Sequence, residues 1–223
     1  MDSKLFFSAI TKFFCGVILI GLLIFVPAWS LVYWQGWLLM GILFVPMFVV
    51  GLIMLAKDPE LLRRRLNSKE EESEQKTVVM LSGIMFLACF IVAGLNFRFK
   101  WIELPASVPI IAAVIFIIGY ALYAEVLREN TFLSRTVEVQ ENQKVIDTGL
   151  YGIVRHPMYM TTLLLFLSMP LVLGSLISFV IMFVYIPIIN KRLKNEEKVL
   201  EANLAGYQDY MKKVKYRVIP YIW

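Results

Sequence analysis

Apolar runs separated by short polar segments fill most of the chain. Four of them have about the 20-residue length that a helix needs to cross a bilayer; they are Phe13–Trp29, Trp37–Leu55, Val78–Phe97 and Pro105–Leu127. Two shorter runs, Met158–Val172 and Leu176–Ile189, are separated by Gly174 and Ser175 and are expected to form a tight hairpin. The pattern predicts an all-α integral membrane protein with about six transmembrane helices.

The polar segments divide the chain into two regions. Residues 1–127 are predicted to form a four-helix transmembrane region that contains a solvated loop at 58–77. Residues 128–223 contain a polar segment at 143–159, the hairpin at 158–189, and a helix and tail at 190–223. Within the last part, Asn190–Leu204 has the pattern of an amphipathic helix, and the basic aromatic tail after it is expected on the membrane surface.

The first apolar run also has the basic start and apolar centre of a signal peptide. However, no A-x-A-like cleavage site follows it, and a second apolar run begins after a few uncharged residues. A helical hairpin fits this part of the sequence better.

Composition supports the membrane interpretation. The chain is 59% hydrophobic and 17% charged, whereas soluble domains are about half apolar and a quarter charged. Both cysteines, Cys15 and Cys89, fall in apolar stretches, so no disulfide framework is expected. The net charge of +5 does not indicate a nucleic-acid partner, because basic residues in membrane proteins usually record topology.

The distribution of basic residues predicts the orientation. Of the 22 lysine and arginine residues, only Arg98 and Lys100 fall in a loop that the helix pattern places outside. By the positive-inside rule both termini face the cytoplasm, and so does the polar segment at 143–159.

The most unusual polar stretch is Thr148–Tyr159, TGLYGIVRHPMY, which holds the only histidine of the chain. Gly149 and Gly152 permit backbone conformations that other residues avoid. Pro157 disfavours helical geometry at His156 and suits the first turn of the helix that follows. Arg155 and His156 are therefore expected at the start of a helix, where donors and the positive helix end can hold an anionic or polar ligand group.

A second unusual cluster lies at Arg192–Glu197. On a helix centred on Leu193, Leu200 and Leu204 continue the apolar stripe, while Glu196 and Glu197 lie about 60° and 40° to either side of it. Carboxylates beside a core-facing stripe need a partner or a ligand. Spacing leaves two alternatives open: a ligand site, or a salt bridge to Arg192 or Arg155. In either case we expect the two clusters to meet.

Two further features indicate ordinary structural roles. Glu125 lies in an apolar run one helical turn from Arg128, and the two are expected to form an ion pair. With a single histidine and no clustered cysteines, no metal site is expected.

These clusters carry a resemblance to a known family. The pattern G-x-Y-x-x-x-R-H-P-x-Y at residues 149–159 is followed by R-x-x-x-E-E-x-x-L at 192–200 and by the tail GYQDYMKKVKYRVIPYIW. In these motifs, which cover about 143–223, the sequence resembles the isoprenylcysteine carboxyl methyltransferase family and its bacterial branch. That family is itself similar to the phospholipid N-methyltransferases.

The resemblance implies an integral membrane enzyme that transfers a methyl group from S-adenosyl-L-methionine to a lipophilic acceptor, such as the carboxylate of a prenylcysteine-like or other lipid-linked small molecule. It implies Arg192, Glu196 and His156 as catalytic residues and Arg192 and Glu197 as substrate-binding residues. Eukaryotic members carry histidine where this chain has Gln143. The implied cofactor pocket comprises Gln143, Lys144, Val145, Ile146, Tyr151, His156, Pro157, Met158, Tyr159 and Glu196.

Two other functions remain as alternatives. A membrane NADPH-dependent reductase of the sterol-reductase type would have a related C-terminal half, but RHPMY and the Glu196–Glu197 pair favour the methyltransferase. A non-catalytic lipid-binding membrane protein would keep the same fold. The expected partners are membrane lipids and a lipophilic small-molecule or lipid-linked acceptor, with no nucleic acid and no metal.

Overall fold

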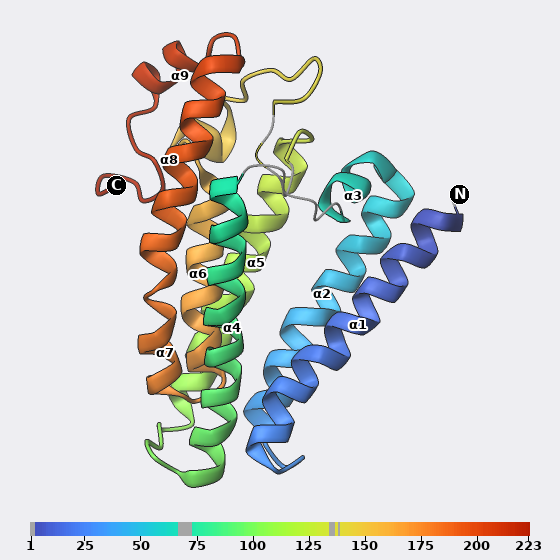
Figure 1. The fold of residues 1–223 in the computed structure, drawn as a ribbon, viewed down its shortest axis with the longest axis vertical. Coiled ribbons are helices and arrows are strands. Elements are labelled where there is room, and N and C mark those ends of the chain that lie inside the picture. The colour runs from blue at the N-terminus through green and yellow to red at the C-terminus, as the bar shows by residue number, and fades with distance from the viewer. Residues whose placement is uncertain (1–2, 67–72, 134–136, 138) are drawn as a thin grey trace.

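A computed structural model describes residues 3–66, 73–133, 137 and 139–223 (Figure 1). This part of the chain is helical and contains no strand, which confirms the predicted all-α fold class. The helices are α1 (Ser3–Ala28), α2 (Trp34–Lys57), α3 (Pro59–Leu66), α4 (Ser73–Phe99), α5 (Ser107–Glu129), the 3₁₀ turn η1 (Gly149–Gly152), α6 (Pro157–Val172), α7 (Leu176–Met182), α8 (Tyr185–Asn203) and α9 (Tyr207–Lys213).

Five helical stretches among the described residues are long and apolar enough to cross a membrane: Lys4–Ala28, Trp34–Lys57, Lys76–Phe99, Ser107–Glu129 and Leu176–Asn203. The apolar helix α6 has 16 residues and is shorter than these. The chain is therefore a multi-pass membrane protein, and the predicted count of about six spans stays a prediction. The predicted loop at 58–77 contains α3 and the start of α4, and its residues 67–72 lie outside the described part.

The second arm of the hairpin differs from its predicted boundaries. The sequence pattern separated an apolar run ending at Ile189 from an amphipathic helix beginning at Asn190, but α8 runs through both. The helix breaks earlier, between Met182 and Tyr185, ahead of Pro187. Because proline has no N–H to donate to the Phe183 carbonyl, Ile186 donates to that carbonyl instead at 3.1 Å. Pro187 then lies in the first turn of α8, where a missing N–H costs little.

The helices form a bundle and an α1–α2 hairpin, which packs on the bundle chiefly through the contact of α1 with α4. Helices α4, α5, α6, α7 and α8 pack together, and the contact between α5 and α6 is the most extensive. Helices α1 and α2 lie side by side and lean away from the bundle toward the end that carries α3 (Figure 1). The same end carries α9, whereas the loop with Arg98 and Lys100 lies at the opposite end. This end, called here the site end, holds the two unusual polar clusters.

Candidate active site

The turn before α6 is shaped by a carboxylate from the end of α5. Glu129 accepts hydrogen bonds from the Thr148 hydroxyl at 2.9 Å and from the Leu150 N–H at 3.2 Å. Gly149 adopts a φ of +48°, and a side chain there would overlap the Glu129 carboxylate. Glycine is required at 149 for both reasons, and the contact fixes η1 on the end of α5.

The C-terminal tail closes over the motif that follows η1. The Arg155 N–H donates to the Tyr216 carbonyl at 2.9 Å, and the His156 N–H donates to the Arg217 carbonyl at 2.8 Å. The tail was expected on the membrane surface, but Val214 and Val218 are buried against the rest of the chain. The tail instead forms one wall of the site, because its backbone satisfies the two amides just ahead of α6.

Glu197 is the centre of a buried ion-pair network. Its carboxylate lies 2.8 Å from Arg155 Nε, 3.0 Å from Arg217 Nε and 3.3 Å from His156 Nε2, and its side chain is only 6% exposed. Arg155 also donates to the Val214 and Lys215 carbonyls. A buried carboxylate with two guanidinium partners is compensated, so of the two alternatives Glu197 follows the salt-bridge one.

Glu196 has different surroundings although it is the next residue. Its side chain is 24% exposed, and one oxygen lies 3.9 Å from His156 Nδ1 on the far side of the ring from Glu197. The Tyr159 hydroxyl donates to Glu196, and Arg192 Nε donates to the Tyr159 hydroxyl at 3.1 Å. His156 thus lies between two carboxylates of α8, and the two sequence clusters meet as predicted.

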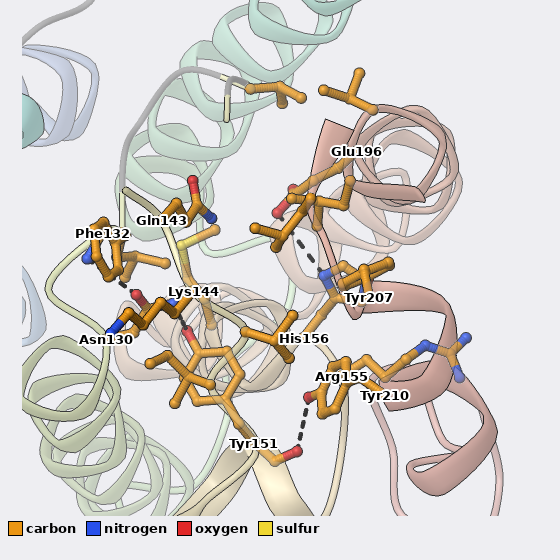
Figure 2. Close-up of a pocket in the computed structure, with 18 of the residues that line it drawn as sticks. Asn130, Phe132, Gln143, Lys144, Tyr151, Arg155, His156, Glu196, Tyr207 and Tyr210 are labelled. Carbon is orange, nitrogen blue, oxygen red and sulfur yellow. Dashed lines mark hydrogen bonds and ion pairs between the residues drawn. The ribbon is translucent and has the colours of Figure 1, made fainter. Parts of the chain in front are cut away.

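A cavity lies in front of Glu196 and is here called the active-site cavity (Figure 2). It has about 850 Å³ of space, open mouth included. Figure 2 shows Glu196 pointing toward His156, with Asn130 and Phe132 on the side opposite Tyr207. Polar groups from α5, α6, α8 and α9 therefore converge on one space.

Comparison with known proteins points to one enzyme family for this region. A family model described as phospholipid methyltransferase matches residues 108–205. The match runs from α5 through α8 and contains the His156 and Glu196 clusters. It supports the resemblance to membrane methyltransferases at the level of that family.

The chain is also similar to a curated relative that is named as a reductase. The Delta(14)-sterol reductase of Mus musculus is 25% identical over 135 residues, which are 53% of this chain and 32% of the relative. The chain thus spans about a third of the length of that relative. This similarity keeps a reductase as the second candidate.

Most of the residues that the methyltransferase resemblance implied lie at the active-site cavity. The lining includes the predicted residues Gln143, Lys144, Val145, Ile146, Tyr151, His156, Met158, Tyr159, Arg192 and Glu196. Pro157 does not line it and instead begins α6 between two residues that do. Glu197 does not line it either: expected to bind substrate, it is held behind His156 by Arg155 and Arg217.

The sequence analysis missed one polar group of the cavity wall. Tyr207 is 4% exposed, and within the described part of the chain its hydroxyl has no hydrogen-bond partner. A buried hydroxyl without a partner is unusual, and Tyr207 is one of the residues that line the cavity. Burial raises the pKa of Tyr207, so the hydroxyl keeps its proton. Tyr207 lies in the tail motif GYQDYMKKVKYRVIPYIW, and its place in that motif was the one sequence signal that could have identified it.

Other missed residues build the walls. Tyr210 donates to the Tyr151 carbonyl at 2.7 Å, and Asn130 donates to the Tyr151 hydroxyl at 2.9 Å. Burial also raises the pKa of Tyr151, so its phenol stays neutral. Arg155, expected beside His156 at a ligand-holding helix start, also lines the cavity; the remaining lining residues that were not predicted are Phe132, Leu133, Val137, Val199, Leu200 and Leu204. Apolar walls with a few converging polar groups are typical of a small-molecule site.

Outside this site, the predicted pair of Glu125 and Arg128 is present. Arg128 donates to both Glu125 oxygens, at 2.6 and 2.8 Å. This confirms a structural role for Glu125.

Proposed function

We propose that this chain is a membrane methyltransferase that uses S-adenosylmethionine and a lipophilic acceptor. The observation that carries the proposal is a cavity faced by Glu196 and His156 in the stretch similar to the phospholipid methyltransferase family. The acceptor is a prenylcysteine-like carboxylate or another lipid-linked small molecule, as the resemblance to isoprenylcysteine carboxyl methyltransferases implies.

The residues of the cavity suit this cofactor. The Glu196 carboxylate accepts hydrogen bonds from an ammonium or ribose hydroxyls, and the Tyr207 hydroxyl offers a donor that has no partner among the described residues. Segment 143–146 and Tyr151 supply the wall opposite α8. His156, held by Glu197, keeps Glu196 on the cavity side of the network.

Positioning is the main task of the protein in this reaction. When bound, S-adenosylmethionine supplies a methyl group on a cationic sulfur, which is transferred by in-line displacement. Tyr159 holds the Glu196 carboxylate, and Arg192 next to it offers a planar guanidinium that orients an acceptor carboxylate. A carboxylate or thiolate acceptor needs no base. For an amine acceptor, Glu196 or His156 is the candidate base, whereas Glu197 is occupied by two arginines.

Calorimetric titration of S-adenosylhomocysteine into the detergent-purified protein tests the cofactor. We expect micromolar binding that weakens about tenfold in Glu196→Gln, which loses a charge-assisted hydrogen bond. Glu201→Gln is the matched control, since Glu201 is exposed on the same helix and does not line the cavity. A folded, monodisperse sample that does not bind S-adenosylhomocysteine would overturn the proposal.

Arg192→Ala tests the division of roles inside the cavity. We expect it to lower acceptor turnover more than the affinity for S-adenosylhomocysteine, because the guanidinium is assigned to the acceptor. An equal loss of both would assign Arg192 to the cofactor instead.

The sterol reductase similarity supports one alternative, an NADPH-dependent membrane reductase. The two functions predict opposite ligand preferences in the same calorimeter cell. Binding of NADPH together with indifference to S-adenosylhomocysteine would favour the reductase, and the reverse would favour the methyltransferase.

The proposed orientation places the site end and both termini in the cytoplasm. The loop with Arg98 and Lys100 at the opposite end would then face outside. A membrane-impermeant maleimide applied to intact cells should label Lys100→Cys and leave Lys212→Cys unlabelled. Labelling of Lys212→Cys alone would reverse the orientation.

A further inference from the structure

A second cavity lies at the end of the molecule opposite to the site end, where α1 and α4 finish, and is here called the distal cavity. It has about 1130 Å³ of space, open mouth included. Its walls come from the α1–α2 turn, from the end of α4 with the loop that follows, and from the α6–α7 turn. In Figure 1 this is the end away from α9. The hairpin and the bundle therefore both contribute to the distal cavity.

The charged side chains that line the distal cavity leave one cation in excess. Lys100 and Glu103 lie 3.5 Å apart as an ion pair and offset each other. The guanidinium carbon of Arg98 lies 5.6 Å from the Trp29 ring centre and 5.1 Å from the Phe99 ring centre. No carboxylate among the described residues forms an ion pair with Arg98. A guanidinium held by aromatic rings keeps its N–H donors, and these suit the oxygens of a phosphate group.

Two residues of the distal cavity have an unfavourable backbone conformation. Trp29 and Lys100 follow the last residues of α1 and α4 with a φ of +52°, a position at which glycine is the usual residue. Glycine would be less strained there, but it would supply neither the ring that holds Arg98 nor the ammonium group that pairs with Glu103. Strained residues of this kind often occur where a protein holds a ligand.

An apolar groove begins at the distal cavity, runs along α1 and is here called the α1 groove. It is lined by residues that include Leu22, Phe25 and Val26, and it has about 1020 Å³ of space, open mouth included. No charged side chain is among the described residues that line it. Trp29 and Ser30 line both the groove and the distal cavity, so the two spaces meet there. A cationic cavity joined to an apolar groove matches the polarity of an amphiphile with an anionic group.

We propose that the distal cavity and the α1 groove together bind one phospholipid of the bilayer. Its phosphodiester lies at Arg98, and one of its acyl chains lies in the α1 groove. The lipid joins the α1–α2 hairpin to the bundle, because Trp29 belongs to the hairpin and Arg98 to the bundle. The site lies at the opposite end of the molecule from the active-site cavity, so this lipid is a structural ligand and not a substrate. The inference does not depend on the proposed methyltransferase function.

Native mass spectrometry of the delipidated full chain in detergent tests the site with three probes. Phosphatidylcholine has the phosphodiester and the acyl chains, diacylglycerol with the same chains lacks the phosphodiester, and glycerophosphocholine lacks the chains. We expect one phosphatidylcholine to bind at least about tenfold more tightly than either of the other two, because each lacks one of the two contacts. Equal binding of phosphatidylcholine and diacylglycerol would overturn the phosphate site. Equal binding of phosphatidylcholine and glycerophosphocholine would overturn the lipid as ligand and leave a site for a free phosphate ester.

Two double variants with the same net charge test the place of the phosphodiester. Arg98→Gln combined with Glu103→Gln removes the ring-held guanidinium, whereas Lys100→Gln combined with Glu103→Gln removes the ion pair and keeps Arg98. The first should weaken phosphatidylcholine about tenfold, and the second should leave its affinity within about twofold of the unmodified value. All three side chains are exposed, so both variants should fold. Equal affinities would show that Arg98 is not the phosphate site and would overturn the proposal.

A pair of leucines on α1 tests the place of the acyl chain. Leu22 lines the α1 groove and is 55% exposed, whereas Leu19 is 56% exposed and does not line it. Leu22→Ala should weaken phosphatidylcholine about threefold, because the chain loses contacts with the leucine side chain. Leu19→Ala is the matched control and should leave the affinity unchanged. The same loss in both variants, or no loss in either, would overturn the assignment of the groove.

Thermal unfolding in detergent tests whether the lipid joins the hairpin to the bundle. A ligand that binds only the folded chain raises the unfolding midpoint, so phosphatidylcholine should raise the midpoint of the unmodified protein. The variant that lacks Arg98 and Glu103 should lose most of this rise at the same lipid concentration, and the variant that lacks Lys100 and Glu103 should keep it. An equal rise in all three proteins would show that the lipid acts as a general solvent for the apolar surface, which would overturn the proposal.

Discussion

The two ends of the helical bundle are held together by different chemistry. At the site end, Glu197 joins Arg155, Arg217 and His156 in a buried network of charged groups. At the opposite end the buried links are neutral, and the ion pair of Lys100 with Glu103 is exposed. The Asn96 side-chain amide donates to the Ile102 and Gly174 carbonyls and accepts a hydrogen bond from the Ile102 N–H. The Ser178 hydroxyl donates to the Cys89 carbonyl.

The difference reflects the cost of burying charge. Neutral hydrogen bonds satisfy backbone groups where helices end, and they need little compensation. A buried carboxylate needs cations, and those cations come from two segments distant in sequence, the turn before α6 and the tail. The charged end is therefore where the fold fixes the position of His156 and, through it, the cavity. Variants at either end should lower the free energy of unfolding, but only variants at the site end should also lower the affinity for S-adenosylhomocysteine.

The largest effect is expected for Glu197→Ala at the charged end. Removal of the carboxylate leaves Arg155 buried without its counter-ion, which should cost about 3–5 kcal/mol in the free energy of unfolding. S-adenosylhomocysteine affinity should fall as well, because His156 and the tail lose their common partner. Chemical unfolding in detergent together with calorimetry measures both effects, with Glu201→Ala as control. A stable variant with normal binding would show that the network has no positioning role.

Asn96→Leu tests the neutral end. The change leaves the Ile102 N–H and carbonyl without their buried side-chain partner, which should cost about 1–3 kcal/mol. The affinity for S-adenosylhomocysteine should stay within about twofold of the unmodified value, since this end is remote from the active-site cavity. If that affinity falls as far as stability does, the two ends are coupled and the comparison fails.

Gly149→Ala tests the backbone conformation of the turn η1 at the site end. A positive φ and overlap with the Glu129 carboxylate should together cost about 1–3 kcal/mol and displace η1. The control is Gly83→Ala on α4, where a side chain meets open space. Thermal unfolding should therefore separate the two variants. Equal midpoints would show that η1 adapts without strain.

The smallest effect is expected for Tyr33→Phe at the neutral end. Tyr33 is fully buried, and its hydroxyl donates to the Leu173 carbonyl just before the α6–α7 turn. Loss of one neutral hydrogen bond should cost about 0.5–1.5 kcal/mol in unfolding and change no ligand affinity. Tyr221→Phe, at an exposed position, is the control and should be silent.

The sequence by itself determined the class of fold and the neighbourhood of the site. In a bilayer, long apolar runs form helices because every backbone group must be satisfied internally, so hydropathy alone predicts them. The break ahead of Pro187 shows the limit of this pattern. Hydropathy changes at Asn190, but the helix follows the hydrogen bonds of the backbone and continues through that point.

Only the tertiary structure distinguished the surroundings of the two adjacent glutamates. On the helical wheel Glu196 and Glu197 flank the same apolar stripe, and nothing in their spacing distinguishes a ligand group from a salt bridge. The tail brings Arg217 to one of them and the turn before α6 brings Arg155 to the same one, which leaves Glu196 at the cavity. Tyr207 was missed for the same reason: the cost of burying a polar group depends on partners that are distant in sequence.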